Sequence, residues 1–353
     1  MTVFPATILS EFPSSPPAAG RRILVTGASG FIGRALVPYL AAQGWTVRAA
    51  VRAITGRRLN GTAAIEPVTL PDLAAPAVSS SEWAPLLDGV DCVIHLAGIA
   101  HATRTLSEAT YMQVNGYAVE ALARAAHHAG VRRVILMSSV RAQSGPNAAE
   151  VLTEDRPAMP TDAYGRSKLR GEIGIGGALG AGATDYVILR PVLVYGPGVG
   201  GNMGALARLA RTPLPLPLGA LTGQRSLLSI DTLCDICRHV IDAPLASRAT
   251  LLVADPGPAL TVRQMMLALR AGLGRGPGMV PVPARVLRIP ARLAGKLEAI
   301  DRLAGPLMVD TGRLLATGWT PAAGSTTQLY LWMQREAGLG VSPPPAATAP
   351  PRS

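Results

Sequence analysis

A glycine-rich turn at the junction of an apolar run and a helical pattern constrains this chain more than any other feature. The segment "RRILVTGASGFIG" places Gly27, Gly30 and Gly33 at three-residue intervals directly after a short β-rich run. A helix N-terminus behind a strand favours an anion, because its free N–H groups and its dipole both attract negative charge. Gly27 would form the tight turn, Gly30 would let the backbone approach a pyrophosphate, and Gly33 would let the helix pack on the strand. The spacing is GxxGxxG and not GxGxxG, so its strand–turn–helix context carries the prediction of a dinucleotide-binding loop, with an empty turn as the alternative.

Short β-rich runs alternate with helical patterns over most of the chain, which predicts an α/β fold with a doubly wound parallel sheet of about seven strands. Pro67 makes the third run a poor strand, and Pro38 should kink the first helix. The expected strands are "RRILVTG" (21–27), "WTVRAAVR" (45–52), "AIEPVTL" (64–70), "DCVIHLAG" (91–98), "RRVILMSS" (132–139), "DYVILRP" (185–191) and "TLLVAD" (250–255).

From about residue 196 onward, proline-rich segments interrupt this alternation and indicate a smaller C-terminal substrate lobe over the carboxyl edge of the sheet. The length of 353 residues fits two domains, or one large domain with such a lobe. The expected division is a disordered arm (1–20), a dinucleotide-binding domain (21–195, with a return segment at about 226–255), the substrate lobe (196–225 and 256–338) and a disordered tail (339–353).

The charge of the chain is strongly positive but scattered. The net charge is +11, and Lys168 and Lys296 are the only lysines among 33 basic residues. The dispersed arginines and the three phenylalanines do not favour nucleic-acid binding, and they would suit an anionic ligand. The sequence shows neither a secretory signal nor an apolar run of membrane-spanning length. We therefore expect a cytoplasmic protein with no membrane span.

The three cysteines do not form a disulfide framework or a predicted metal site. Cys234 and Cys237 form a CxxC pair, but a structural zinc site needs four ligands and the chain has no second pair. The segment "SIDTLCDICRHVI" has apolar residues at helical spacing. We predict that both cysteines lie on one face of a helix, and that Cys92 lies in a strand.

The end of the second predicted strand bears on the choice of cofactor. An acid there would bind the ribose 2′-hydroxyl of NAD, whereas an arginine suits the 2′-phosphate of NADP. The strand ends at Arg52, with Arg57 and Arg58 beyond it and no Asp or Glu nearby. NADP is slightly favoured over NAD, and the alternative for Arg52 is a solvated charge at a strand end.

A second motif, "YGRSK", follows the fifth predicted strand and would place Tyr164 and Lys168 on one face of a helix. A phenol has a pKa of about 10, and a useful base should titrate near pH 7, which requires about 4 kcal/mol in favour of the phenolate. One cation about 4 Å away supplies about that much, and Lys168 could be that cation. Ser139, or Ser138 in its place, could hold the substrate oxygen. A surface pair at helical spacing is the alternative.

With these motifs in place, the chain resembles an extended short-chain dehydrogenase/reductase of the NAD-dependent epimerase/dehydratase family. The segments "TGASGFIG", "HLAG", "MSSV", "DAYGRSK" and "LRPVLVYGPG" occur in the family's order, and the resemblance covers about residues 21–335. It implies a seven-stranded Rossmann domain, a smaller substrate lobe, and an NAD(P)-dependent epimerase, dehydratase or reductase that acts on nucleotide sugars.

The resemblance also implies individual roles. Ser139, Tyr164 and Lys168 match the catalytic triad, and Asn115 matches an asparagine on the helix behind it. Asn202 and Arg225 match positions that hold the nucleotide-sugar diphosphate. An arginine suits such a position, because its planar guanidinium fits paired phosphate oxygens. Ser139 is also expected to contact the substrate. The cofactor-binding residues are expected to be Gly27, Gly30, Phe31, Ile32, Gly33, Arg52, Asp72, Leu96, Ala97, Gly98, Tyr164, Lys168 and Pro191.

Several positions depart from the 4-epimerases of this family. Leu193 lies near the position where an asparagine often follows the sixth strand, Pro71 replaces a glycine before Asp72, and a C-terminal segment resembles the 4-keto-hexose reductases of surface-polysaccharide synthesis. Epimerisation and reduction at C4 of a UDP-sugar therefore both remain open. The other interpretations are a reductase of a small ketone, of steroid or flavonoid type, and a sensor or assembly factor that binds NAD(P) without turnover. A homodimer is a possible assembly.

Overall fold

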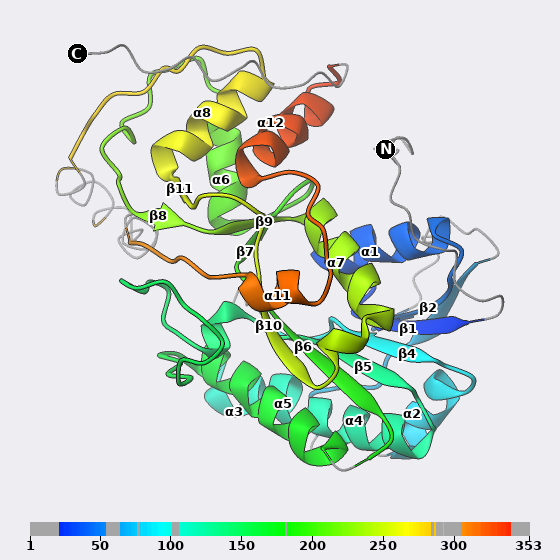
Figure 1. Cartoon of the computed structure of the whole chain (residues 1–353). Helices are drawn as coiled ribbons and strands as arrows, with labels where there is room; N and C mark the ends of the chain where they lie inside the picture. Colours follow the sequence, from blue (N-terminus) through cyan, green and yellow to red (C-terminus); the bar gives the residue numbers. More distant parts are fainter. Residues whose placement is uncertain are drawn as a thin grey trace.

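Seven parallel strands form the central sheet, and helices cover both of its faces (Figure 1). The computed structural model describes residues 21–53, 64–75, 78, 80–100, 106–180, 182–283, 286, 292 and 305–339. The strands of this sheet are β1 (Arg22–Thr26), β2 (Thr46–Val51), β3 (Ile65–Thr69), β4 (Cys92–His95), β5 (Arg133–Met137), β6 (Asp185–Pro191) and β10 (Ala249–Val253). Their spatial order is β10-β6-β5-β4-β1-β2-β3, and every neighbouring pair is parallel. The predicted doubly wound α/β fold, with its seven strands, is confirmed.

The helices fall into two layers on the sheet and a separate group beyond it (Figure 1). Helices α1 and α7 pack on one face of the sheet, and α2, α4 and α5 pack on the other. In chain order the helical segments are α1 (Phe31–Ala42), α2 (Ser80–Leu87), α3 (Glu108–Met112), the π-helix η1 (Gln113–Tyr117), α4 (Ala118–His128), the 3₁₀ turn η2 (Val140–Ala142), α5 (Ala163–Leu179), α6 (Gly201–Ala210), α7 (Ile230–Asp242), the 3₁₀ turn η3 (Pro244–Ala246), α8 (Val262–Gly272), α11 (Gly312–Ala316) and α12 (Ser325–Glu336).

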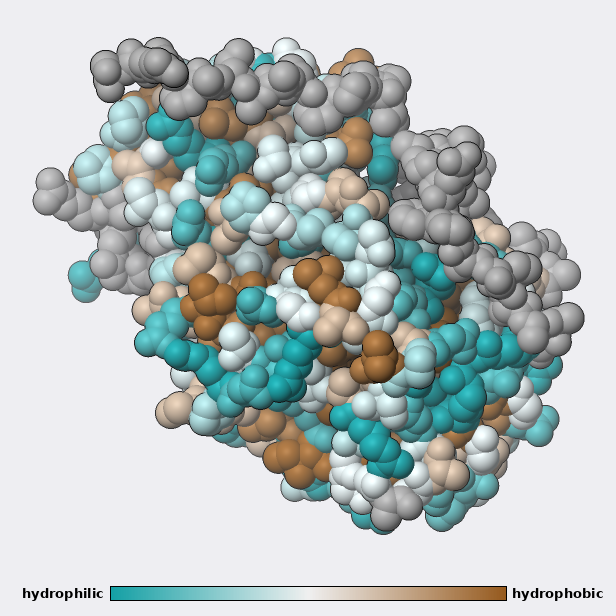
Figure 2. Space-filling view, in the orientation of Figure 1, coloured by the Kyte–Doolittle hydropathy of each residue, from teal (hydrophilic) through white to brown (hydrophobic). Residues whose placement is uncertain are grey.

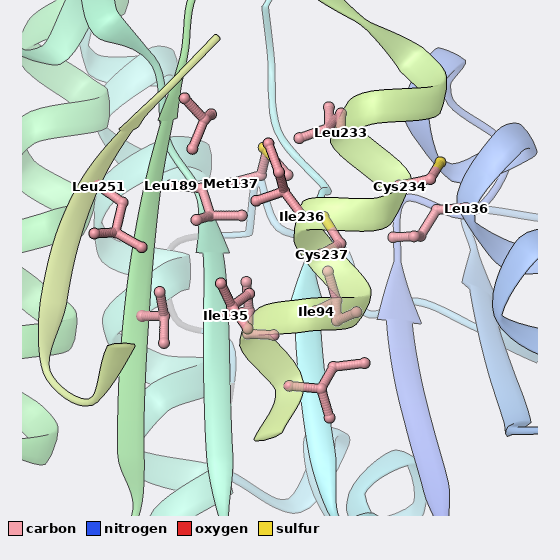
Figure 3. Close-up of a cluster of buried hydrophobic side chains, with 14 of the residues drawn as sticks. Leu36, Ile94, Ile135, Met137, Leu189, Leu233, Cys234, Ile236, Cys237 and Leu251 are labelled. Atoms are coloured by element: carbon pink, nitrogen blue, oxygen red, sulfur yellow. The ribbon is translucent and has the colours of Figure 1, made fainter. Parts of the chain in front are cut away.

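Side chains of the central strands alternate between two hydrophobic cores. On β4, Cys92 and Ile94 enter the core beneath α1 and α7, whereas Val93 enters the core beneath α4 and α5. Figure 3 shows the first of these cores, with Cys237 of α7 directed toward the central strands and Cys234 beside Leu36 of α1. Because both faces are buried, the strands read as continuous apolar runs in the sequence.

The two prolines that conflicted with the predicted elements are accommodated. Pro67 lies in β3, which is an edge strand of the sheet, and a proline is tolerated there because the outer side of an edge strand needs no ladder hydrogen bond. Pro38 lies inside α1, which nevertheless continues to Ala42. Both segments therefore keep the secondary structure that their apolar pattern predicts.

A second group of elements forms a third hydrophobic core beyond the sheet. Strand β7 (Leu193–Tyr195) pairs with β9 (Leu227–Ser229), and β8 (Gln224–Arg225) pairs with β11 (Leu260–Thr261). Helices α6, α8 and α12 enclose the core, whose members include Met203, Met265, Leu329 and Trp332. Since β7 begins two residues after β6 ends, this group continues from the carboxyl edge of the sheet.

A buried carboxylate joins this group to the chain segment that follows β10. Asp255 accepts hydrogen bonds from the hydroxyl of Tyr195 (2.9 Å), from the hydroxyl of Ser325 (2.8 Å) and from the backbone N–H of Ser229 (2.8 Å). Residues 1–20 and 340–353, which include the expected arm and nearly all of the expected tail, lie outside the described residues.

The surface mixes polar and apolar residues. On the face shown in Figure 2, hydrophobic residues form separate patches among hydrophilic ones. None of the helices in the described part of the chain combines the length and hydropathy needed to cross a bilayer.

Candidate functional site

The glycine-rich turn lies at the carboxyl end of β1, where it touches the end of β4. Gly27 has a positive φ of 69°, and a Cβ there would lie 2.8 Å from the backbone nitrogen of Ala97. A Cβ at Gly33 would lie 2.4 Å from the carbonyl oxygen of Gly27, so α1 packs directly on the turn. Any side chain at either position would push the turn away from β4 or from the helix.

The first turn of α1 offers its backbone N–H groups to an anion. The helix begins at Phe31 after the N-cap Gly30, with no side-chain cap and no acidic residue in its first turn. Phe31 and Ile32 are partly buried and pack against the core. The cradle therefore fits the pyrophosphate of a dinucleotide, because the helix dipole and the uncapped N–H groups both favour it.

The other expected cofactor residues line the same edge of the sheet. Arg52 is exposed immediately after β2, and Asp72 is exposed after β3, where its carboxylate accepts the N–H of Ala74 (3.0 Å). Beyond β4, the N–H of Leu96 donates to the carbonyl oxygen of Thr26 (3.3 Å), and the N–H of Ala97 donates to the side-chain hydroxyl of Thr26 (3.2 Å). These bonds hold the loops after β1 and β4 side by side.

Asn115 fixes the segment after β4 against α5. It is buried in η1, where its Oδ1 accepts the N–H of Ile99 (2.9 Å) and its Nδ2 donates to the carbonyl oxygen of Ile99 (2.9 Å) and to the hydroxyl of Ser167 (3.0 Å). Gly98 passes between Asn115 and Lys168, because a Cβ at Gly98 would lie 2.7 Å from Oδ1 of Asn115 and 3.3 Å from Nζ of Lys168. Glycine at this position therefore lets both side chains reach the edge of the sheet.

Ser139, Tyr164 and Lys168 meet where β5 ends. Tyr164 and Lys168 both lie on α5, as their spacing predicted, and the side chain of Ser139 makes a hydrogen bond with Tyr164. Tyr164 is half-buried, and its ring meets that of Tyr111 edge to face at 6.5 Å between centroids. Lys168 is buried, and its Nζ donates to the carbonyl oxygen of Met137 (2.9 Å). The structure thus brings together the three residues expected to form the triad.

The protein groups around Tyr164 set its pKa differently from our expectation. Burial raises the pKa of Tyr164, while the hydrogen bond with Ser139 and then the charge of Arg141 act to lower it. The largest charge effect on Tyr164 thus comes from Arg141 and not from Lys168, whose own pKa burial lowers to about 8. Arg141 did not stand out in the sequence, because its proximity to Tyr164 depends on the turn after β5.

A buried ion pair between Glu172 of α5 and Arg190 of β6 lies next to the triad in the sequence of α5. Glu172, one helical turn after Lys168, accepts hydrogen bonds from Nε and Nη2 of Arg190, the shortest of them at 2.6 Å, and also from the hydroxyl of Ser138. Nη1 of Arg190 donates to the side chain of Gln143 (3.1 Å). Arg190 directly precedes Pro191, the expected contact of the nicotinamide amide. The sequence analysis did not identify this pair. The position of Glu172, four residues after Lys168 on the same helix, was the local signal that could have pointed to it.

The two residues expected to hold a diphosphate lie in the second group of elements. Asn202 is half-buried in the first turn of α6. Arg225 is buried and donates to the carbonyl oxygens of Gly305 (2.7 Å) and Pro146 (2.9 Å) and to the side chain of Asn147 (2.9 Å). Burial, together with the charge of Arg141, lowers the pKa of Arg225 to about 10. The fork of Arg225 is thus occupied by protein oxygens, which the sequence did not indicate.

The cysteines lie in the core. Cys234 and Cys237 are buried on α7, as the helical pattern predicted, and Cys92 is buried in β4. Burial raises the pKa of the Cys92 thiol to about 12 and that of the Cys237 thiol still further, so both stay protonated at neutral pH. Among the residues that the structure describes, no three or more His, Cys, Asp or Glu side chains are grouped so as to hold a metal ion.

Comparison with known proteins finds a matching family model, and the relatives of this chain include nucleotide-sugar epimerases and a ceramide reductase. The family model described as "NAD dependent epimerase/dehydratase family" matches residues 23–253. A UDP-glucose 4-epimerase of Vibrio cholerae is 32% identical over 309 residues, which cover 85% of this chain and 91% of that protein. A ceramide reductase of Caulobacter vibrioides is 29% identical over 314 residues, covering 89% and 83%. A crystal structure of a UDP-galactose 4-epimerase shares the fold, with a TM-score of 0.67 and 22% identity over 90% of this chain and 99% of that one.

Proposed function

Since the chain belongs to the NAD-dependent epimerase/dehydratase family, we propose that it is an NAD(P)-dependent oxidoreductase or epimerase that acts at C4 of a nucleotide-diphosphate sugar. The observation that carries the proposal is the meeting of Ser139, Tyr164 and Lys168 at the edge of the sheet that also bears the Gly27 turn. Surface-polysaccharide synthesis is the setting in which we expect such a sugar to be used.

The residues divide the chemistry among them. The hydroxyl of Tyr164 passes a proton to or from the C4 oxygen of the sugar, and Ser139 holds that oxygen by a hydrogen bond. The ammonium of Lys168, on the same helix as Tyr164, would bind the ribose next to the nicotinamide. When bound, the dinucleotide supplies the hydride donor or acceptor, and the protein positions and polarises the reactants.

The position of the cofactor follows from the backbone. The turn at Gly27 and the uncapped first turn of α1 would hold the pyrophosphate, Asp72 would lie beside the adenine, and Pro191 would contact the nicotinamide amide. The segment from Leu96 to Gly98 would flank the ribose. These assignments rest on the close approach of β1 to β4 and on the family resemblance.

The substrate lobe would bind the sugar nucleotide through Asn202 and Arg225. A diphosphate bound by Arg225 would compete with the protein oxygens that its guanidinium contacts. A reductase of a small ketone, of steroid or flavonoid type, is the second candidate; the protein oxygens bound to Arg225 and the ceramide reductase relative favour a substrate without a diphosphate. We expect a homodimer, to be tested by light scattering.

Purification of the full chain separates the candidates. Tightly retained NAD, together with interconversion of UDP-sugars at C4, would support an epimerase. A protein free of nucleotide that oxidises NADPH in the presence of a 4-keto UDP-sugar would support a reductase, and oxidation of NADPH only with an uncharged ketone would support the second candidate. Binding of NAD(P) without turnover on any of these substrates would contradict both and leave a cofactor-binding sensor.

A substitution at Arg52 tests the expected preference for NADP over NAD. The variant Arg52→Glu should bind NADPH about 10- to 100-fold more weakly, because it replaces a charge-assisted hydrogen bond to the 2′-phosphate by repulsion. Affinity for NADH should stay within about twofold, since NADH has no phosphate there. Fluorescence titration of both nucleotides measures the effect. Arg124→Glu on α4 is the control, and equal losses for NADH and NADPH would contradict the preference.

A further inference from the structure

Arg141 and Asp162 form an ion pair that bridges the turn after β5 and the beginning of α5. Nη2 of Arg141 donates to Oδ2 of Asp162. Asp162 is the N-cap of α5, and its Oδ1 accepts the N–H of Gly165 at 2.7 Å. Tyr164 lies between the cap and Gly165 in sequence. The pair therefore joins the two segments that carry Ser139 and Tyr164.

We propose that Arg141 is a positioning residue of this site, whose ion pair with Asp162 holds the turn that bears Ser139 against the start of α5 and places a positive charge near Tyr164. The inference rests on the proposed function, in which Tyr164 is the acid and base. It assigns to the Arg141–Asp162 pair a role that the residues of the triad do not fill.

The orientation of Ser139 follows from its hydrogen bonds. Ser139 is the N-cap of η2, and its Oγ accepts the backbone N–H of Arg141 at 3.1 Å. This bond fixes the position of Oγ, and the hydroxyl proton can be donated to Tyr164 or to a substrate oxygen. The backbones are also in close contact, since a Cβ at Gly165 would lie 2.2 Å from the carbonyl oxygen of Arg141. A shift of η2 would therefore be felt directly at α5.

The charges around Tyr164 have opposing effects on its ionisation. The guanidinium of Arg141 favours the phenolate, whereas the carboxylate of Asp162 and the nearby Tyr111 of α3 disfavour it. Farther along α5, Lys168 donates to the carbonyl oxygen of Met137, and the negative charge of Glu172 raises the pKa of Lys168 and so favours its charged form. The outward-facing Arg166 pairs with Glu108 of α3. Removal of Arg141 and removal of Asp162 should therefore move the pKa of Tyr164 in opposite directions.

This opposition gives an experiment that does not depend on turnover. The full chain is labelled with ¹³C at the tyrosine Cζ, and the Tyr164 signal is identified by its absence from Tyr164→Phe. In Arg141→Gln, the inflection of its pH titration should rise by about one pH unit. In Asp162→Asn, which keeps a capping side chain, it should fall by a similar amount. Arg141→Lys should restore the inflection to within about half that shift, and the control Arg166→Gln should leave it unchanged.

Rate measurements give the functional counterpart. In the direction that oxidises the sugar alcohol, Tyr164 acts as a base, so kcat should rise with pH as Tyr164 loses its proton. The midpoint of this rise should move to higher pH in Arg141→Gln and to lower pH in Asp162→Asn. Inflections that move in the same direction in both variants, or that do not move, would overturn the inference. If the wild-type protein turned over no sugar nucleotide, the proposed function would fail, while the titration would still decide the role of the pair.

Discussion

Replacing Tyr164 by phenylalanine should lower kcat by about 10²- to 10⁴-fold, because the substitution removes the hydroxyl that we propose as the acid and base at C4. The ring should stay in place, since its edge-to-face contact with Tyr111 needs no hydroxyl. The free energy of unfolding and the affinity for NAD(P) should therefore change little. Steady-state turnover with the substrate found for the wild type, together with a cofactor titration, measures both effects.

A matched control is available on a neighbouring element. Tyr117 in η1 is half exposed, and the guanidinium of Arg170 packs over its ring at 4.8 Å. Tyr117→Phe also removes one phenolic hydroxyl and keeps the aromatic face, so it should retain wild-type turnover. If Tyr164→Phe turned over at the wild-type rate, Tyr164 would not be the acid or base, and the proposed mechanism would be wrong.

Replacing Glu172 by alanine should lower the free energy of unfolding by about 3–5 kcal/mol. Glu172 and Arg190 are both almost fully buried, and Arg190 would lose three of its hydrogen bonds while its charge stayed in the interior. Ser138 would lose its acceptor as well. Urea unfolding of the wild type and the variant, followed by circular dichroism, measures the difference.

Two further variants show whether the uncompensated charge causes this loss. The double variant Glu172→Met with Arg190→Met removes both charges of the pair at similar volume and should recover much of the stability, because Arg190 no longer leaves an uncompensated charge in the interior. Glu108→Ala removes one partner of the exposed Arg166 pair and should cost far less than Glu172→Ala. Equal losses for Glu108→Ala and Glu172→Ala would contradict the explanation.

The sequence predicted the sheet well because the sheet is buried on both faces. Six of its strands are short, largely buried runs, and the exception is β3, which is partly exposed and contains Glu66 and Pro67. Pro67 weakened the prediction for β3, and the structure explains this by placing β3 at an edge. The conflict at Pro38 was milder than expected, because α1 continues past it to Ala42.

The second group of elements was predicted only as a proline-rich lobe. Its strands are two or three residues long, and each pairs with a distant segment, as β7 does with β9. Such short strands carry too few residues for a recognisable period. The bonds between Arg225 and the carbonyl oxygens of Pro146 and Gly305 depend on the same distant pairings, so no local pattern could reveal them.

The candidate site was predictable where one motif holds its parts together. Tyr164 and Lys168 are four residues apart on one helix, and Gly27 and Gly33 belong to one turn. Arg141 and Asp162 are 21 residues apart in sequence, and their meeting requires both the turn after β5 and the start of α5. Pairs of this kind need the three-dimensional structure, because neither residue is unusual in its own segment.

The place of β10 in the sheet bears on how the chain can be synthesised and truncated. The residues expected to bind the cofactor and to transfer the proton end at Pro191, yet the outer neighbour of β6 is β10, from residues 249–253, and α7, which helps to cover one face, comes from residues 230–242. A nascent chain that ends just after β7 would have β6 as an unpaired edge strand and would expose the apolar face of the sheet on which α7 packs. Both features promote aggregation. We therefore expect that a fragment ending near residue 195 would not fold by itself, because its sheet and one of its helical layers are completed by α7 and β10, between residues 230 and 253.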